Sequence, residues 1–179
     1  VRVSASAPGG AAAFAIRPYP AQFVEHIEWR GRTLTLRPIR PEDEAQHLAF
    51  LARLDPTDIR MRIFYSRRSI ERSELARLTQ IDYDREMAFI AVTEKDGVEV
   101  EIGVCRYATN PDGESCEFAI VVADDWQGKG LARRLMGVLI ETARSRGLKY
   151  MNGDFLSENG RMLAFVQSLG FVMSPHPED

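Results

Sequence analysis

The most constraining feature of this sequence is a glycine-rich turn that joins an apolar, strand-like segment to a long amphipathic segment. Residues 116–123 read Cys-Glu-Phe-Ala-Ile-Val-Val-Ala, and after a short loop the chain continues as Gln127-Gly-Lys-Gly-Leu-Ala132. From Leu131 onward, apolar residues recur at helical spacing until Gly147, a residue typical of a helix end. The pattern predicts a strand, a loop and a helix in that order.

This turn is a candidate anion site. Glycines at a helix start allow backbone N–H groups to converge on an anion, and the helix dipole favours phosphate there. The small residues at 128, 130 and 132 would let a diphosphate lie directly on the backbone. Neither of two common phosphate motifs is complete, because Arg133 replaces the third glycine of the dinucleotide fingerprint and Gly130 replaces the Ser or Thr of the nucleotide-triphosphatase loop. An ordinary tight turn before a helix is the alternative interpretation.

Composition narrows the class of protein. The 179 residues are 45% hydrophobic and 27% charged, which is typical of one globular domain. A net charge of −3 argues against a general nucleic-acid binder, and no apolar run approaches the roughly 20 residues of a membrane helix. The two cysteines, Cys105 and Cys116, and three scattered histidines cannot build a disulfide framework or a zinc site. We expect a cytoplasmic protein without a metal and without a nucleic-acid or membrane partner.

The pattern along the chain predicts an α+β domain over residues 26–179, preceded by a linker over residues 1–25 from a missing N-terminal region. Alternation around Gly31 predicts a hairpin over 26–40, and Pro41 begins a helix whose apolar face carries Leu48, Leu51 and Leu54. The remaining expected strands cover residues 87–93, 98–107, 116–123 and 149–155. One further helix is expected to begin at Asp55, and others to cover residues 69–78, 131–146 and 159–169.

The glycine-rich turn resembles a known signature. A Gln-x-x-Gly-x-Gly/Ala pattern that follows a strand and opens a helix is the acyl-CoA-binding motif of the GNAT acyltransferases, and Gln127, Gly130 and Ala132 occupy its three defining positions. Asn159 and the Leu169-Gly170-Phe171 ending are similar to the last helix of that superfamily. The resemblance implies the GNAT fold, a mixed and mainly antiparallel sheet with helices on both faces, here lacking its last strand.

Two further segments narrow the resemblance. Residues 36–44 (LRPIRPEDE) and 78–88 (LTQIDYDREMA) look like the catalytic domain of bacterial protein lysine acetyltransferases. In that family the GNAT domain is often fused to a large region similar to acyl-CoA synthetases. The implied partner is a protein substrate, an AMP-forming acyl-CoA synthetase, whose active-site lysine would be acetylated.

The resemblance also implies how the acyl donor, acetyl-CoA, would bind. It would lie in a splay between residues 116–123 and 149–155, with backbone groups of Val121 and Ala123 bonded to its pantetheine arm. Lys129, Arg133 or Arg134 could neutralise its phosphates, although a solvated helix face is as good an explanation for the two arginines. The expected donor-binding residues are Val121, Val122, Ala123, Gln127, Gly128, Lys129, Gly130, Leu131, Ala132, Arg133 and Asn159.

The expected reaction is direct attack of a lysine amine on the thioester, and it needs a base, because a lysine ammonium with a pKa near 10.4 is not a nucleophile. Glu117 is the candidate, since alternation places it on one strand face with Ala119 and Val121, and the resemblance points to the same position. A strand-edge carboxylate without a role is the alternative. The second choices for the base are Glu86, Asp82, Asp84 and Asp154.

Two features leave other mechanisms and functions open. Many GNAT enzymes carry a tyrosine, which protonates the leaving thiolate, at the position of Val166, so the general acid is unassigned. A covalent route through Cys116 is the other enzymatic mechanism, but this cysteine should point away from Glu117. A small-amine acetyltransferase and a non-catalytic acyl-CoA sensor are the alternative functions.

Overall fold

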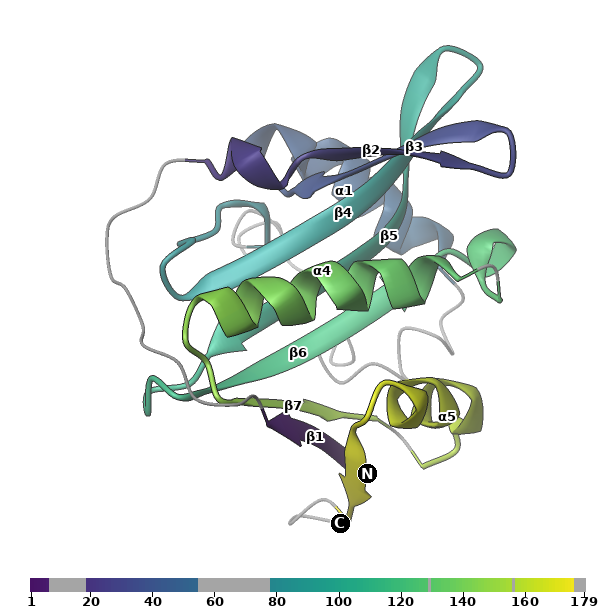
Figure 1. The fold of residues 1–179 in the computed structure, drawn as a ribbon. Helices are drawn as coiled ribbons and strands as arrows, with labels where there is room; N and C mark the ends of the chain where they lie inside the picture. The colour runs from purple at the N-terminus through teal and green to yellow at the C-terminus, as the bar shows by residue number, and fades with distance from the viewer. Residues whose placement is uncertain (7–18, 55–77, 129, 156, 176–179) are drawn as a thin grey trace.

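The computed structural model describes residues 1–6, 19–54, 78–128, 130–155 and 157–175, and it shows an eight-stranded sheet with helices on both faces (Figure 1). The order across the sheet is β2-β3-β4-β5-β6-β7-β1-β8. All neighbouring strands are antiparallel except β6 and β7, which are parallel. The mixed, mainly antiparallel α+β architecture expected from the sequence is confirmed. The strands are β1 (Arg2–Ser6), β2 (Glu25–Trp29), β3 (Arg32–Pro38), β4 (Glu86–Lys95), β5 (Val98–Thr109), β6 (Ser115–Val122), β7 (Tyr150–Asp154) and β8 (Val172–Ser174).

The helices and tight turns follow the local sequence signals. The α-helices are α1 (Glu44–Arg53), α4 (Leu131–Ser145) and α5 (Gly160–Ser168), and the short 3-10 helices are η1 (Ala21–Phe23), η2 (Pro41–Asp43) and η4 (Asp124–Trp126). The β2–β3 turn uses Arg30 and Gly31 at φ 51° and 79°, the left-handed pair that a two-residue hairpin requires. The helices expected from Asp55 and over 69–78 lie outside the described residues. Within the described part, no helix is both long and apolar enough to cross a membrane.

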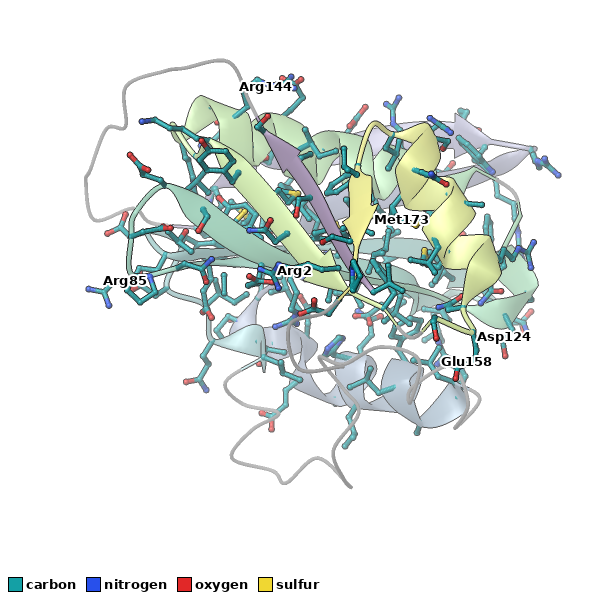
Figure 2. The ribbon with its side chains drawn as sticks, turned by 90° about the horizontal axis from the view of Figure 1, so that it is seen from below. Arg2, Arg85, Asp124, Arg144, Glu158 and Met173 are labelled. Atoms are coloured by element: carbon teal, nitrogen blue, oxygen red, sulfur yellow. The ribbon has the colours of Figure 1, made fainter. Side chains whose placement is uncertain are left out.

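The helices form two layers, one on each face of the sheet (Figure 2). On one face, α4 buries Leu135 and Leu139 in the larger core cluster, which also holds alternate side chains of β6 such as Ile120. On the other face, α1 contributes Phe50 to a second cluster that contains Val121. Successive β6 side chains therefore point to opposite layers, as the pleat of a strand requires.

The apolar face of α1 differs from the one expected. Leu48 is 46% exposed, whereas the neighbouring His47 is fully buried. The His47 ring bonds through Nδ1 to Glu101 Oε2 at 2.7 Å, so a buried polar pair takes the place of an aliphatic contact. The expectation that Leu48 faces inward is therefore wrong, and the partner Glu101 in β5 decides that His47 takes the buried position.

The N-terminal segment is a strand of the sheet, so the prediction of a linker is wrong for Arg2–Ser6. β1 pairs with β7 over five residues and with β8 over three. Its second residue, Val3, is fully buried in the larger cluster. In Figure 1 this strand, at the purple end of the chain, lies between β7 and the yellow β8. Residues 7–18 of the expected linker lie outside the described residues.

Candidate active site

The parallel strands β6 and β7 diverge along their length. Their pairing covers only Ser115 to Glu117 against Tyr150 to Asn152, although β6 continues to Val122 and β7 to Asp154. Beyond this point Phe118 lies against Gly153, where an added Cβ would come within 2.6 Å of the ring. The strands therefore open a splay at the position that the sequence analysis assigned to acetyl-CoA.

At the open end of the splay, the glycine-rich turn forms the beginning of α4. Gly128 and Gly130 have φ of 73° and 87°, conformations that side chains other than glycine rarely adopt. Gly130 is the N-cap of α4 and provides no side-chain cap, and the first turn contains no acidic residue. The first N–H groups of the helix and the positive end of its dipole are therefore not neutralised by an acid of their own helix, as an anion site requires.

A groove of about 270 Å³ lies in front of this helix start. Gln127 is fixed at its edge because Nε2 donates to Val122 O at 3.2 Å and to Asp124 Oδ1 at 3.3 Å. Seven of the expected donor-binding residues line the groove, namely Val122, Gln127, Gly128, Gly130, Ala132, Arg133 and Asn159. The groove brings the β6 end, the turn and the beginning of α5 into one place.

Two arginines supply positive charge beside the groove. Arg133 is exposed, donates to Ser168 Oγ at 2.9 Å and lies 5.8 Å over the Phe165 ring. Arg161 approaches Gly128 so closely that a Cβ there would meet its Nη2 at 2.8 Å. Arg134, in contrast, forms an ion pair with Glu25 of β2, so its guanidinium lies on the β2 side of α4 and not at the groove. Arg133 and Arg161 thus bring two positive charges to the groove.

The β6 residues whose backbone groups face the splay are not the ones that were predicted. Ala123 N–H donates to Ile102 O at 2.9 Å within the sheet, so the expectation that it bonds a ligand is wrong. Antiparallel alternation turns the backbone of Val121 to β5 as well. The same alternation directs the backbone of Phe118, Ile120 and Val122 toward β7 and the splay.

Of the expected donor-binding residues, Leu131 does not line the groove, whereas Asn159 lines it and has a second contact. The Leu131 side chain is 1% exposed and belongs to the core, so only its backbone N–H faces the anion site. Asn159 caps α5, because its Oδ1 accepts from Met162 N at 3.3 Å. Lys129 lies outside the described residues.

The sequence analysis missed four residues that line the groove: Trp126, Arg161, Met162 and Phe165. Met162 and Phe165 are both partly buried. Trp126 and Arg161 carried no motif, since a tryptophan in a loop and an arginine in a first helical turn are ordinary residues. Only the packing of α5 beside the α4 start brings them together.

The candidate base Glu117 lies where the splay begins. It faces the α1 layer together with Val121, as alternation predicted, and is 31% exposed. Arg2 of β1 contacts Glu117 through Nη2, and its Nη1 lies 3.2 Å from Asp154 Oδ1. Burial lowers the pKa of the Arg2 guanidinium, but the two carboxylates outweigh this and raise it above its ordinary value. The two carboxylates, of Glu117 and Asp154, and the single guanidinium of Arg2 have a formal net charge of −1.

The second-choice bases lie at three different places. Asp154 shares Arg2 with Glu117. Glu86 is in the same transverse row of the sheet, because it pairs with Ala108 and Ala108 pairs with Glu117, which places it two strands or about 10 Å away. Asp82 and Asp84 are exposed in the turn before β4, and Asp82 lies 4.0 Å from Arg85. Glu117 is therefore the acid at the divergence of the two strands.

The cysteine route has no support in the structure. Cys116 is fully buried in the core on the α4 face, opposite to Glu117. Burial, reinforced by the charges of Glu117 and Asp112, raises the pKa of its thiol to about 12. A thiolate nucleophile is strongly disfavoured there.

The position of the absent tyrosine is also buried. Val166 on α5 is fully enclosed in the larger cluster and does not reach the splay. A proton donor for a leaving thiolate would have to come from another residue or from water.

Comparison with known proteins gives a consistent result. A family model described as an acetyltransferase (GNAT) domain matches residues 33–172. An acetyltransferase of Pseudomonas aeruginosa is 36% identical over 149 residues, which cover 83% of this chain and 80% of the relative. The acetyltransferase Pat of Mycolicibacterium smegmatis is 32% identical over 158 residues, which cover 88% of this chain but only 45% of that protein.

Solved structures agree with this fold. The GNAT domain of PAT from S. lividans superposes with a TM-score of 0.78 at 23% identity, over 90% of this chain and 95% of that domain. An aminoglycoside N-acetyltransferase in complex with CoA superposes with a TM-score of 0.61 at 18% identity, over 84% and 95% of the two chains.

Proposed function

Because this chain belongs to the GNAT acetyltransferase family, we propose that it transfers an acetyl group from acetyl-CoA to the ε-amine of a lysine on a protein. The observation that carries the proposal is that Val122, in the part of β6 that no longer pairs with β7, lines the groove at the α4 start, while Glu117 is the last β6 residue of that pairing. The groove suits the diphosphate of CoA, and the splay suits its extended arm. Family membership and the CoA complex of a structural neighbour support acetyl-CoA as the donor.

The donor would bind by two kinds of contact. Its diphosphate accepts hydrogen bonds from the first N–H groups of α4 and ion pairs from Arg133 and Arg161. Its pantetheine amides pair with the β6 backbone that faces the splay, much as an added strand would. The thioester then lies toward Glu117.

The chemical step would be direct attack in a ternary complex. Glu117 takes a proton from the acceptor ammonium, directly or through water, and the neutral amine attacks the thioester carbon. A new N–C bond forms, the C–S bond breaks, the CoA thiolate leaves with the electron pair, and the new amide nitrogen loses its second proton to water. Water can protonate this thiolate, since Val166 offers no hydroxyl.

The acceptor is assigned from charge and from resemblance. The net negative charge of Glu117, Asp154 and Arg2 favours a cationic amine at the closed end of the splay. The relative named Pat and the segments 36–44 and 78–88 support a protein lysine, and an AMP-forming acyl-CoA synthetase is the proposed target. The proposed location is the cytoplasm, where acetyl-CoA and such synthetases meet.

The acceptor is tested by intact-mass analysis of an AMP-forming acetyl-CoA synthetase incubated with acetyl-CoA and this protein. The expected result is a gain of one acetyl group that maps to an active-site lysine. A synthetase whose active-site lysine is changed to arginine is the matched control and should gain nothing.

A negative result separates the alternatives. If the synthetase stays unmodified while free amines such as aminoglycosides or amino acids support CoA release, the protein is a small-amine acetyltransferase. If acetyl-CoA binds and no acceptor supports CoA release, the protein is an acyl-CoA sensor.

A further inference from the structure

We propose that Arg2, on the N-terminal strand β1, is a positioning residue that holds Glu117 in place for proton transfer. The proposal rests on the function proposed above and adds a residue to that site. Residues 2–6, which were predicted to be part of a linker, would then contribute a residue to the active site.

The contacts of Arg2 define its role. Its guanidinium bridges two acids, with Nη1 at 3.2 and 3.3 Å from the two Asp154 carboxylate oxygens and Nη2 on Glu117 Oε1. The planar fork of an arginine fixes both partners in one geometry, which a single lysine ammonium does less well. Asp154 thus anchors Arg2, and Arg2 orients Glu117.

The same contacts leave Glu117 able to react. Arg2 holds Oε1, whereas no hydrogen bond or ion pair to Oε2 is found among the described residues. The Glu117 side chain lies on the α1 side of the sheet, and 31% of its surface is exposed. One carboxylate oxygen is therefore fixed and the other can meet the acceptor amine.

The position of Arg2 is set by the sheet and not by a loose end of chain. Arg2 lies opposite Asp154 in the β1–β7 pairing and opposite Ser174 in the β1–β8 pairing. The adjacent Val3 is fully buried on the other face, which fixes the direction of the Arg2 side chain. In Figure 2, Arg2 lies inside the outline of the sheet, whereas Arg85 and Arg144 extend from its periphery.

An alternative role would give the opposite result. A guanidinium on two acids also resembles a bound cationic substrate, and an autoinhibitory plug would have to leave before the amine could enter. The buried Val3 and the pairing of β1 on both of its edges argue against such a displacement. Removal of a plug would raise activity, whereas removal of a positioning residue lowers it.

The test compares Arg2→Ala, Arg2→Lys and Arg144→Ala in steady-state acetyl transfer, with acetyl-CoA affinity measured by calorimetry and folding checked by thermal unfolding. Arg144→Ala is the matched control, because it removes another arginine–carboxylate pair, with Glu141 at 2.7 Å, on α4. We expect Arg2→Ala to lower kcat by about 10- to 100-fold, with KM for acetyl-CoA within about twofold. Arg2→Lys should recover about a third of the loss, and Arg144→Ala should match the wild type.

A chemical rescue distinguishes positioning from a general effect on folding. Added guanidinium chloride, at about 10–50 mM, should raise the kcat of Arg2→Ala at least about threefold and leave Arg144→Ala unchanged, because the free cation can occupy the emptied position. A structural role alone predicts no rescue at concentrations that far below denaturing ones.

The failure of the Arg2 proposal can be distinguished from the failure of the proposed function. If the wild type transfers acetyl groups and Arg2→Ala stays within about threefold of it or exceeds it, the positioning role is wrong and the proposed function stands. If the wild type transfers nothing to any amine, both proposals are wrong.

Discussion

Gly130 shows how one residue position determines both the local backbone and the anion site. It caps α4 with φ of 87°, a conformation that costs other residues about 1–2 kcal/mol. A Cβ there would lie 3.4 Å from the Trp29 ring, which is an ordinary contact. The requirement for glycine is therefore conformational and not a matter of space.

A Gly130→Ala variant should consequently lose about 1–2 kcal/mol of unfolding free energy in urea titration. Its affinity for acetyl-CoA should fall about tenfold, because the strained turn no longer directs its N–H groups at one point. Gly137→Ala is the control, since Gly137 lies within α4 with open space around it and should gain about 0.5–1 kcal/mol. Equal acetyl-CoA affinity in Gly130→Ala and the wild type would contradict the assigned anion site.

At the scale of elements, β1 is the part of the fold that departs most from the sequence prediction. Its second residue, Val3, is fully buried in the cluster shared with α4 and α5. The strand joins β7 to β8, which have no direct pairing with each other in the described sheet. Loss of β1 would therefore disconnect the last strand as well.

A Val3→Ala variant should lower the unfolding free energy by about 1–3 kcal/mol, because two buried methyl groups are removed and a cavity remains. Val98→Ala is the matched control, since Val98 is 63% exposed at the tip of the β4–β5 hairpin and should change stability by less than about 0.5 kcal/mol. Chemical denaturation of both variants measures the difference. Similar stabilities for the two would show that β1 does not belong to the cooperative core.

The reason that β1 escaped prediction is the range of its contacts. The β2–β3 hairpin and α4 have local signals at Gly31, Gly130 and Gly147, and each was predicted. β1 has the sequence RVSAS, in which Val3 is the one aliphatic residue beyond alanine, and its partners lie about 150 positions away in β7. The same distance in sequence hides the contact of Arg2 with Glu117, although Glu117 itself was predicted from strand alternation.

Over the whole molecule, one buried ion pair couples folding to pH. Arg37 on β3 forms two hydrogen bonds with Asp43, at 2.7 and 2.8 Å, and both side chains are almost fully buried. Burial alone would raise the pKa of the Asp43 carboxyl, but Arg37 and the Arg40 backbone N–H outweigh it and lower the pKa below its ordinary value. The pair contributes stability that is fully present above the unfolded-state pKa of about 3.9 and is lost as the pH falls through the lower folded pKa.

We therefore expect the unfolding free energy of the wild type to decrease as the pH falls below about 4, measured by denaturation across the acid range. Asp43→Asn should lower stability at neutral pH by about 2–4 kcal/mol, because Arg37 loses its buried charge partner, and should weaken the acid dependence. The exposed Asp84→Asn variant is the control and should retain the wild-type profile. An unaltered acid profile in Asp43→Asn would contradict the assigned origin of this dependence.

The central claim is that acetyl-CoA bound at the α4 start is attacked by an amine that Glu117 deprotonates. The most direct measurement is the kcat of acetyl transfer by Glu117→Gln together with its acetyl-CoA affinity by calorimetry. Glu114→Gln, an exposed change beside Lys149, is the control. If Glu117 is the base, kcat should fall by about 100-fold or more while the affinity stays within about twofold. A kcat within about threefold of the wild type would exclude Glu117 as the base.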